Sequence, residues 1–279
     1  MKVSNMSSPT QATKAAKKLK PRTMGAFNWI GLQTLIAKEV GRFVSVYTQT
    51  IIAPVVTMLL FYTVFMLAFG GVQREIGEIS FLNFLAPGLI MMTMAQNAYA
   101  NTSSSIVIAK VQGNIVDVLM PPLSTLELMI GYLTGSILRG VVIGVAGVIV
   151  VGLIVGIPIS NIWYIISFSI LGTMMMGALG VIGGIWSEKF DHIAAYSNFV
   201  ITPLTFLSGT FYSIHTLPAA WEKFALYNPV FYMIDGFRAG FITQADADPM
   251  TGLAVLVGTN IVLCLIIYRM IDSGYKIKS

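Results

Sequence analysis

Few side chains in this sequence of 279 residues are of types that carry out chemistry. It contains two histidines, His192 and His215, and a single cysteine, Cys264, which lies within an apolar run. A lone cysteine excludes a disulfide framework and a thiolate metal site. The motif G-x-x-x-x-G-K-[ST] and even the dipeptide Gly-Lys are absent, so we expect no loop that holds the phosphates of ATP. The sequence therefore predicts a protein that is not an enzyme and that has no cofactor or metal of its own.

The segment 110–122 is the most distinctive stretch between two apolar runs. It reads K-V-Q-G-N-I-V-D-V-L-M-P-P, so Lys110 and Asp117 stand among the apolar side chains of a short amphipathic helix. Two prolines cannot continue that helix, and the following Ser124-x-x-Glu127 is a capping box that begins a new one. Such a stiff lever could transmit force from a docked partner, or it could be only a connector.

The elements that position these residues are apolar helices. Apolar residues make up 56% of the chain and charged residues 10%, whereas a soluble domain carries about 25% charged residues. This composition excludes a soluble globular enzyme and a disordered protein. A helix needs roughly 20 apolar residues to cross a bilayer and satisfies its own backbone hydrogen bonds there. We predict an all-α polytopic membrane protein with six transmembrane helices, at about 51–70, 81–105, 126–158, 162–186, 194–212 and 252–270.

Lysine and arginine are unevenly distributed around these spans. With a cytoplasmic N-terminus, thirteen basic residues lie on the inside and three, Arg74, Lys223 and Arg238, lie on the outside. This asymmetry predicts that both termini are cytoplasmic. It also explains the net charge of +5 without nucleic acid. We interpret residues 1–26 as a basic, disordered cytoplasmic tail, with contact to anionic lipid as the alternative.

Residues 27–49 have the period of an amphipathic helix, with Trp29 on the apolar side and Lys38 and Arg42 on the polar side. Such a helix is expected to lie in the cytoplasmic membrane interface. Its role could be that of a membrane anchor. Equally, it could present Lys38, Glu39 and Arg42 to a cytoplasmic partner.

Charged groups inside the predicted spans are rare, which argues against an ion-coupled carrier. Arg139 precedes the uncharged stretch 141–157, so we expect it near the cytoplasmic edge, either snorkelling or paired within the chain. Contact with a substrate or partner is the alternative. Phe61, Phe65 and Phe69 form a stripe at i, i+4 and i+8 that favours packing or lipid contact, with a substrate route as the alternative.

The stretch 208–248 is too apolar for a solvated loop, and Pro218 and Pro229 interrupt it. Short helices at the outer interface, or dipping into it, satisfy both facts. They could form a lid over a translocation route or an inert cap.

These residues resemble the permease subunits of ABC-2 type ATP-binding-cassette exporters over nearly the whole chain after Phe27. The similarity points to the YadH-like bacterial inner-membrane branch of that family. Its most specific part is the run T-P-L-T-F-L-S-G-T-F-Y at 202–212. The other parts are Lys38-Glu39-x-x-Arg42, Pro87 to Met92, Leu119-Met120-x-Pro122-Leu123-Ser124, Leu217-Pro218, Trp221, Asn228-Pro229, Tyr232, Gly236 and Arg238.

The resemblance implies one transmembrane domain over 27–279 that pairs with a second permease, most simply an identical copy, and with separate ATPase subunits that bind ATP and Mg. It implies outward transport of an amphipathic or lipid-linked substrate across the inner membrane, with an outer re-entrant hairpin at about 213–240. The residues implied to contact the ATPase are Lys38, Glu39, Arg42, Lys110, Asn114, Asp117, Leu119 and Pro122. Candidates for the pathway or an outer gate are Phe61, Phe65, Phe69, Phe206, Phe211, Tyr212 and Trp221.

Two other functions remain open. A non-transporting membrane anchor or regulatory subunit of a larger assembly would have the same composition. An integral-membrane transferase or hydrolase would depend on Glu188, Asp191 or His192 and would work without an ATPase.

Overall fold

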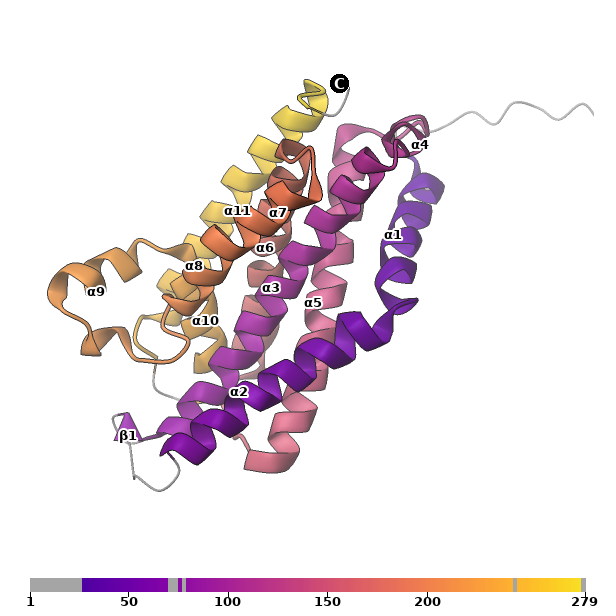
Figure 1. Cartoon of the computed structure of the whole chain (residues 1–279). Helices are drawn as coiled ribbons and strands as arrows, with labels where there is room; N and C mark the ends of the chain where they lie inside the picture. The colour runs from indigo at the N-terminus through magenta and orange to yellow at the C-terminus, as the bar shows by residue number, and fades with distance from the viewer. Residues whose placement is uncertain (1–26, 70–74, 77–78, 243–244, 277–279) are drawn as a thin grey trace, which may run out of the picture.

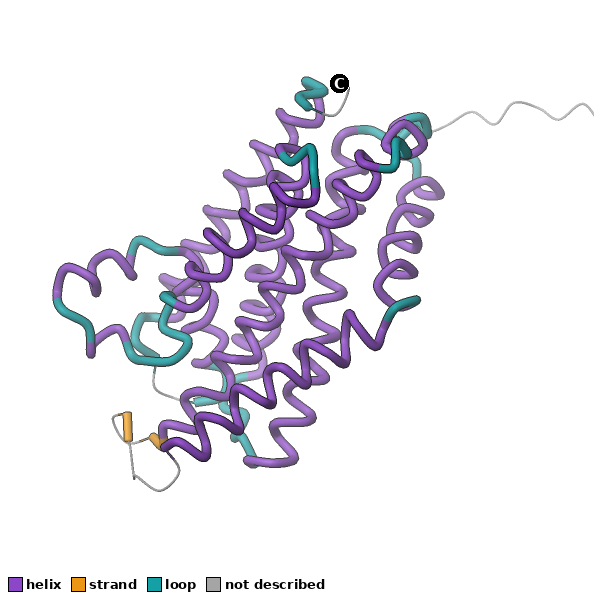
Figure 2. Tube along the Cα trace, viewed as in Figure 1, coloured by secondary structure: helices purple, strands orange, loops and turns teal. Residues whose placement is uncertain are grey.

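The computed structural model describes residues 27–69, 75–76, 79–242 and 245–276, and the predicted tail 1–26 lies outside them (Figure 1). The described chain is mostly helical (Figure 2). A short antiparallel ribbon pairs β1 (Glu75–Ile76) with β2 (Ile79–Ser80). Figure 1 shows α4, the start of α1 and the end of α11 at one end of the helices and β1 at the other. We refer to these as the α4 end and the β1 end.

Four helices among the described residues are long and apolar enough to cross a membrane. The first joins the π-helix η1 (Thr48–Ile52) to α2 (Ala53–Phe69). The others are α5 (Thr125–Val155), α6 (Ile162–Trp186) and α11 (Pro249–Asp272). The bounds of α6 are those predicted for the fourth span, and the predicted capping box begins α5.

α3 (Phe81–Val111) is the central helix and packs mainly against α5 and α6. It has 31 residues, six more than the predicted span, and includes Lys110 in its last turn. Polar residues over 96–105 leave it less apolar than the four spans above. Its closest neighbour is α6, because the glycines of α6 let the two backbones approach: a Cβ on Gly180 would lie 2.4 Å from the carbonyl oxygen of Tyr99.

The fifth predicted span, 194–212, is displaced in the structure. Helix runs from α7 (Phe190–Tyr196) through the π-helix η2 (Ser197–Ile201) into α8 (Thr202–Phe206). It begins four residues early and ends six residues early. The chain turns away after α8 because Gly209 has a φ of 76°, which favours glycine.

The predicted outer hairpin contains η3 (Ile214–Thr216), α9 (Ala219–Leu226) and α10 (Pro229–Ala239). α9 projects to the side of the bundle (Figure 1). In contrast, α10 packs against α3, α6 and α11, and its residues 230–239 are all buried. Arg238, which the distribution of basic residues placed on the outer side of the membrane, has a fully buried side chain.

α1 (Trp29–Val44) is shorter than the predicted helix 27–49 and packs along α5. Its buried side consists of Leu32, Leu35, Glu39 and Phe43. Trp29, which was predicted on the apolar side, is 64% exposed and does not belong to this packed side. The glycines of α5 explain the contact: a Cβ on Gly131 would lie 2.4 Å from Leu35. The short helix α4 (Ile115–Leu119) connects α3 to α5 at this end of the bundle.

Candidate functional site

The predicted coupling residues gather at the α4 end, but they differ in accessibility. Asn114, Asp117 and Pro122 are exposed, and Asp117 stands in the first turn of α4. Leu119 is half-buried against the core. Lys110 belongs to α3 rather than to a free loop.

Two exposed apolar side chains, Val116 on α4 and Met120 at its C-cap, were not among the site residues predicted from the sequence. Val116 is 54% exposed and Met120 is 76% exposed, on either side of Asp117 in the chain. Neighbouring exposed apolar groups rimmed by polar residues occur at protein or membrane contact surfaces. The exposed surface of α4 therefore consists of Val116, Asp117 and Met120, which we call the α4 surface.

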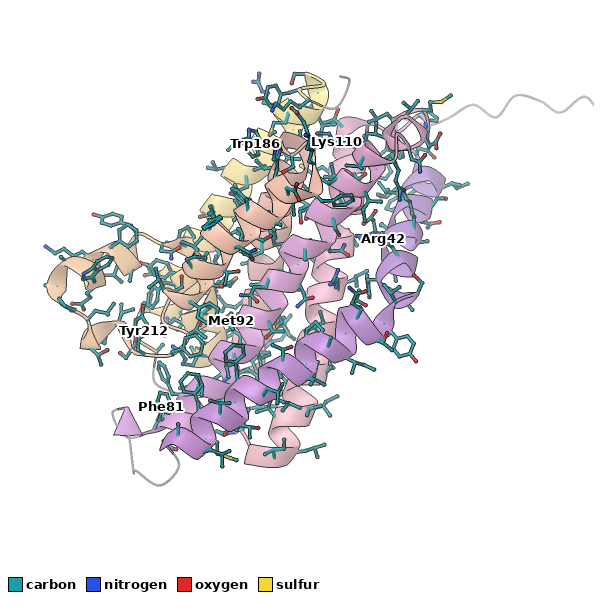
Figure 3. The ribbon with its side chains drawn as sticks, in the orientation of Figure 1. Arg42, Phe81, Met92, Lys110, Trp186 and Tyr212 are labelled. Atoms are coloured by element: carbon teal, nitrogen blue, oxygen red, sulfur yellow. The ribbon has the colours of Figure 1, made fainter. Side chains whose placement is uncertain are left out.

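Lys110 ties the end of α3 to the end of α6. Its Nζ donates to the carbonyl oxygens of Ile185, at 2.8 Å, and Ser187, at 2.7 Å. In Figure 3 the labelled Lys110 and Trp186 lie together at the α4 end. A cation here satisfies carbonyls that a helix end leaves unpaired.

The α6–α7 turn is also held by the C-terminal segment. Lys276 Nζ lies 3.2 Å from Glu188 Oε1. The hydrogen bond and charge of Lys276 lower the pKa of Glu188 below its ordinary value. The end of α6 is thus joined to both α3 and the segment after α11.

The start of α1 is joined to the start of α5. Glu127 Oε2 accepts from the backbone N–H of Ser124 at 2.6 Å, within the capping box. Glu127 Oε1 accepts from the backbone N–H of Asn28. The side-chain Nδ2 of Asn28 donates to the carbonyl oxygen of Pro122 at 3.2 Å. A displacement of the segment after α4 would therefore move the start of α1 and the start of α5 together.

Lys38, Glu39 and Arg42 do not share one exposed face. Lys38 is exposed, but Glu39 is fully buried and its Oε1 accepts from Ser105 Oγ at 2.6 Å. Arg42 lies 3.1 Å from Glu39 Oε2 and donates to the carbonyl oxygen of Asn101 at 2.6 Å. Figure 3 shows where Arg42 lies on α1. The carboxylate of Glu39 therefore holds α1 to α3, and Lys38 is the exposed one of the three.

Arg139 does not reach the interface by snorkelling. Its side chain is buried, with 8% of the residue exposed, and its Nη2 donates to Asn97 Oδ1 at 2.9 Å. It stands fourteen residues into α5, about 21 Å along the helix axis. The expected pairing within the chain is present, and the partner is a neutral amide.

The predicted aromatic residues come together near the β1 end. Ring centroids are 6.4 Å apart for Phe61 and Phe206, 5.3 Å for Phe65 and Phe211, and 5.2 Å for Phe206 and Phe211. We call these four rings the aromatic cluster. It joins α2 to α8 and the turn after α8.

The other three aromatic candidates lie elsewhere. Trp221 is 61% exposed on α9 and contacts Phe224. The hydroxyl of Tyr212 donates to the carbonyl oxygen of Leu207 at 2.7 Å. The side chain of Phe69 lies outside the described part of the chain.

A cavity of about 440 Å³ lies between η1, α2, α3 and α8, with two rings of the aromatic cluster, Phe61 and Phe206, in its wall. We call this cavity the polar groove, since its wall includes Gln49, Thr57, Thr93, Gln96, Asn97 and Thr202. Sequence reasoning missed these residues. A sequence pattern that indicates a polar stripe was present in α3, where Thr93, Gln96 and Asn97 lie at i, i+3 and i+4 within an apolar run.

Both walls of the polar groove contain a π-helical turn followed by proline. Gln49 belongs to η1, and Pro54 follows its end. Thr202 follows η2, and Pro203 comes next. Proline cannot donate to the carbonyl four residues earlier, and its ring crowds that carbonyl, so the helix widens locally. Such turns occur frequently at functional sites.

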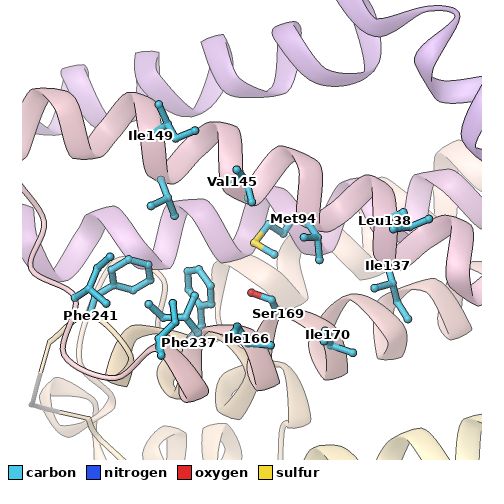
Figure 4. Close-up of a pocket in the computed structure, with 16 residues that line it drawn as sticks. Met94, Ile137, Leu138, Val145, Ile149, Ile166, Ser169, Ile170, Phe237 and Phe241 are labelled. Atoms are coloured by element: carbon cyan, nitrogen blue, oxygen red, sulfur yellow. The ribbon is translucent and has the colours of Figure 1, made fainter.

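A second cavity, of about 450 Å³, lies between α5, α6 and α10 (Figure 4). Its lining side chains are apolar apart from Ser169, with Met94, Ile166, Phe237 and Phe241 among those labelled in Figure 4. An apolar wall of this kind suits hydrocarbon.

Neither histidine belongs to a metal-binding group: among the described residues, no three or more His, Cys, Asp or Glu side chains are placed so that they could hold a metal ion. The His192 ring is tilted against that of Trp186, with 5.9 Å between the ring centroids. His215 Nδ1 lies 3.0 Å from Glu222 Oε1, and its hydrogen bond to the Glu222 carboxylate raises the pKa of His215.

Residues 31–242 match the family model described as ABC-2 type transporter. The chain is 35% identical over 252 residues to the inner membrane transport permease YadH of Escherichia coli K12, covering 90% of this chain and 98% of that protein. It is 24% identical over 191 residues to nodulation protein J of Rhizobium leguminosarum bv. viciae, covering 67% of this chain and 73% of that protein.

Proposed function

Because this chain belongs to the ABC-2 type transporter family, we propose that it is the transmembrane permease subunit of an ATP-driven exporter. It moves an amphipathic or lipid-linked substrate outward across the inner membrane. ATP and Mg are bound by a separate cytoplasmic ATPase. The observation that carries this proposal is the α4 surface, which is exposed for docking and connected by hydrogen-bonded neighbours to α1, α5 and α6.

The topology that we propose has six spans and two cytoplasmic termini. Four spans are the long apolar helices, and α3 and the segment α7–η2–α8 are the other two. α9 and α10 form the outer re-entrant hairpin. Residues 27–279 act as one transmembrane domain, and 1–26 as its cytoplasmic tail.

Coupling begins when the ATPase docks on the α4 surface. Its movement shifts α4, which is continuous with α3 through a short turn and with α5 through the capping box. Lys110 passes the shift to α6, and Asn28 passes it to α1. Nucleotide acts here by biasing two packed arrangements of these helices.

The pathway that we propose follows the polar groove and ends at the aromatic cluster. Polar side chains facing lipid would be costly, so a second copy of the chain covers the groove in a homodimer. Gln96 Nε2 donates to Thr205 Oγ1 at 3.0 Å, which holds α8 against α3 in the closed state. The two π-helical turns supply hinges about which α2 and α8 separate.

The test is purification of the tagged chain in mild detergent from cells that also produce the ATPase encoded beside its gene. The variant is Asp117→Lys on the α4 surface. The matched control is Asp191→Lys, which changes an exposed acid on the α6–α7 side of the same end. We expect stoichiometric ATPase with the native chain and with the control, and loss with Asp117→Lys.

Two outcomes would contradict the proposal at different levels. Full recovery of the ATPase with Asp117→Lys would remove the docking role of the α4 surface. Absence of ATPase with the native chain would remove the exporter assignment and leave a membrane anchor or an integral-membrane transferase or hydrolase. Equal insertion of all variants, measured in washed membranes, is the condition for either conclusion.

A further inference from the structure

The contact between α1, α3 and α5 holds more positive than negative charge. Arg42 and Arg139 contribute two positive charges, and Glu39 contributes one negative charge. A Cβ on Gly135 would lie 2.7 Å from Glu39 and 3.3 Å from Asn101 Nδ2, and Arg139 follows one turn later on the same side of α5. The two arginines are close enough to interact electrostatically. We call Arg42, Asn97, Asn101 and Arg139 the arginine site.

The arginine site contains N–H donors that lack acceptors. Within the described part of the chain, Nε of Arg42, Nε of Arg139 and Nδ2 of Asn101 are buried and have no hydrogen-bond partner. Leaving a buried donor unpaired is costly, and leaving a buried charge uncompensated costs more. Native proteins satisfy nearly all such groups, so three together indicate a missing acceptor.

The arginine site adjoins the polar groove. Asn97 belongs to both, since it lines the groove and accepts from Arg139. The Arg42 side chain remains 25% exposed, although it bonds Asn101 and Ser104. Asn97 is therefore the point at which a ligand in the groove comes nearest to the arginine site.

We propose that the arginine site binds a phosphate-type oxyanion, the anionic head of an amphiphile. One such group supplies several acceptor oxygens and the negative charge that the cluster lacks. Guanidinium groups match the geometry of phosphate oxygens better than lysine does. The binding itself does not depend on the ATPase, but the identification of the ligand as cargo rests on the proposed transport function.

The experiment compares two labelled lipids with identical chains, a fluorescent phosphatidylglycerol and a fluorescent phosphatidylcholine. Binding to the purified chain in neutral detergent is measured by fluorescence anisotropy. We expect the native chain to bind the anionic lipid about tenfold or more tightly than the neutral one, the size of a charge-assisted contact. Arg139→Gln should abolish that preference.

Asn101→Asp separates a binding role from a packing role. The new carboxylate would stand where Asn101 Oδ1 already lies 3.0 Å from Arg42, so it compensates the surplus charge from within. The fold should be kept or strengthened, while the preference for the anionic lipid is lost. Lys38→Gln is the matched control, because it removes an exposed charge from the same helix and should leave the preference intact.

The outcomes distinguish the sources of the anion. Competition by inorganic phosphate would show that the head group alone is recognised, and lipid binding without such competition would show that the chains are required. Equal lipid preference in the native chain, Arg139→Gln and Asn101→Asp would overturn the proposal. The lipid-binding assay contains no ATPase. A failure of the lipid-binding proposal is therefore independent of the co-purification result.

Discussion

Replacing Arg238 by glutamine removes a cation that ties α10 to α3. Arg238 Nε donates to the carbonyl oxygen of Phe84 at 3.2 Å, and its Nη2 donates to that of Gly209 at 2.6 Å. Its guanidinium carbon lies 3.6 Å from the centre of the Phe84 ring. The acid facing it is Asp235, at 3.4 Å, which is also buried.

The cost of single substitutions follows from the charge that each leaves behind. Removing one partner of a buried ion pair costs about 3–5 kcal/mol, because the other charge is uncompensated. Asp235 also accepts from the backbone N–H groups of Asp246, at 3.1 Å, and Ala247, at 2.9 Å, which offset part of that cost. We expect Arg238→Gln to lower the free energy of unfolding by about 3 kcal/mol and Asp235→Asn by about 2 kcal/mol.

The double variant decides whether the two charges act as a pair. With both charges removed no uncompensated ion remains, so the combined loss should be about 3 kcal/mol rather than about 5. The assay is reversible unfolding in mixed micelles with added SDS, followed by tryptophan fluorescence. Amide hydrogen exchange gives a local readout, and it should increase in α10 before α6.

Additivity would refute this reasoning. If the double variant loses the sum of the single losses to within about 0.5 kcal/mol, the pair is not coupled and the stability of α10 has another origin. Unchanged hydrogen exchange in α10 with Arg238→Gln would show that the arginine does not hold this helix in place.

Two further predictions use the same protein preparations. Gly180→Ala should cost about 1–3 kcal/mol, because its Cβ would meet the carbonyl oxygen of Tyr99 at 2.4 Å, whereas Gly152→Ala, with nothing within 4 Å, should be neutral or slightly stabilising. Equal stabilities would contradict the close packing of α3 and α6. The contact between His215 and Glu222 should protect the amides of α9 below the unfolded pKa of histidine, about 6.5, and this protection should be lost as the pH rises through the raised folded pKa. Glu222→Gln should remove this pH dependence, and a variant that keeps it would exclude the pair as its cause.

Features that depend on neighbours in the chain could be predicted from the sequence. The composition and the apolar runs gave a membrane protein, and the prediction of a helix over 162–186 is confirmed. The capping box of Ser124 and Glu127 is also confirmed, since a cap joins groups three residues apart. The order and spacing of the motifs pointed to the family that the comparisons establish.

Segments with competing local signals were predicted less well. The apolar run 194–212 suggested one continuous span, but Gly209 turns the chain and the prolines widen the helix. The helix α1 has apolar groups on several sides, so its packing side depended on α5.

The positions of the charges were decided by the tertiary structure alone. Arg42 bonds Asn101, 59 residues away, and Arg238 bonds the carbonyl oxygen of Phe84, 154 residues away. The polar groove likewise joins α2, α3 and α8. Hydropathy and caps depend on adjacent residues and are present in the sequence as written, so the sequence by itself determined the class of protein and most of its helices. Whether a charged side chain is exposed, paired or buried without a counter-charge depends on which helix packs beside it. The packing of helices is established only when the whole chain folds.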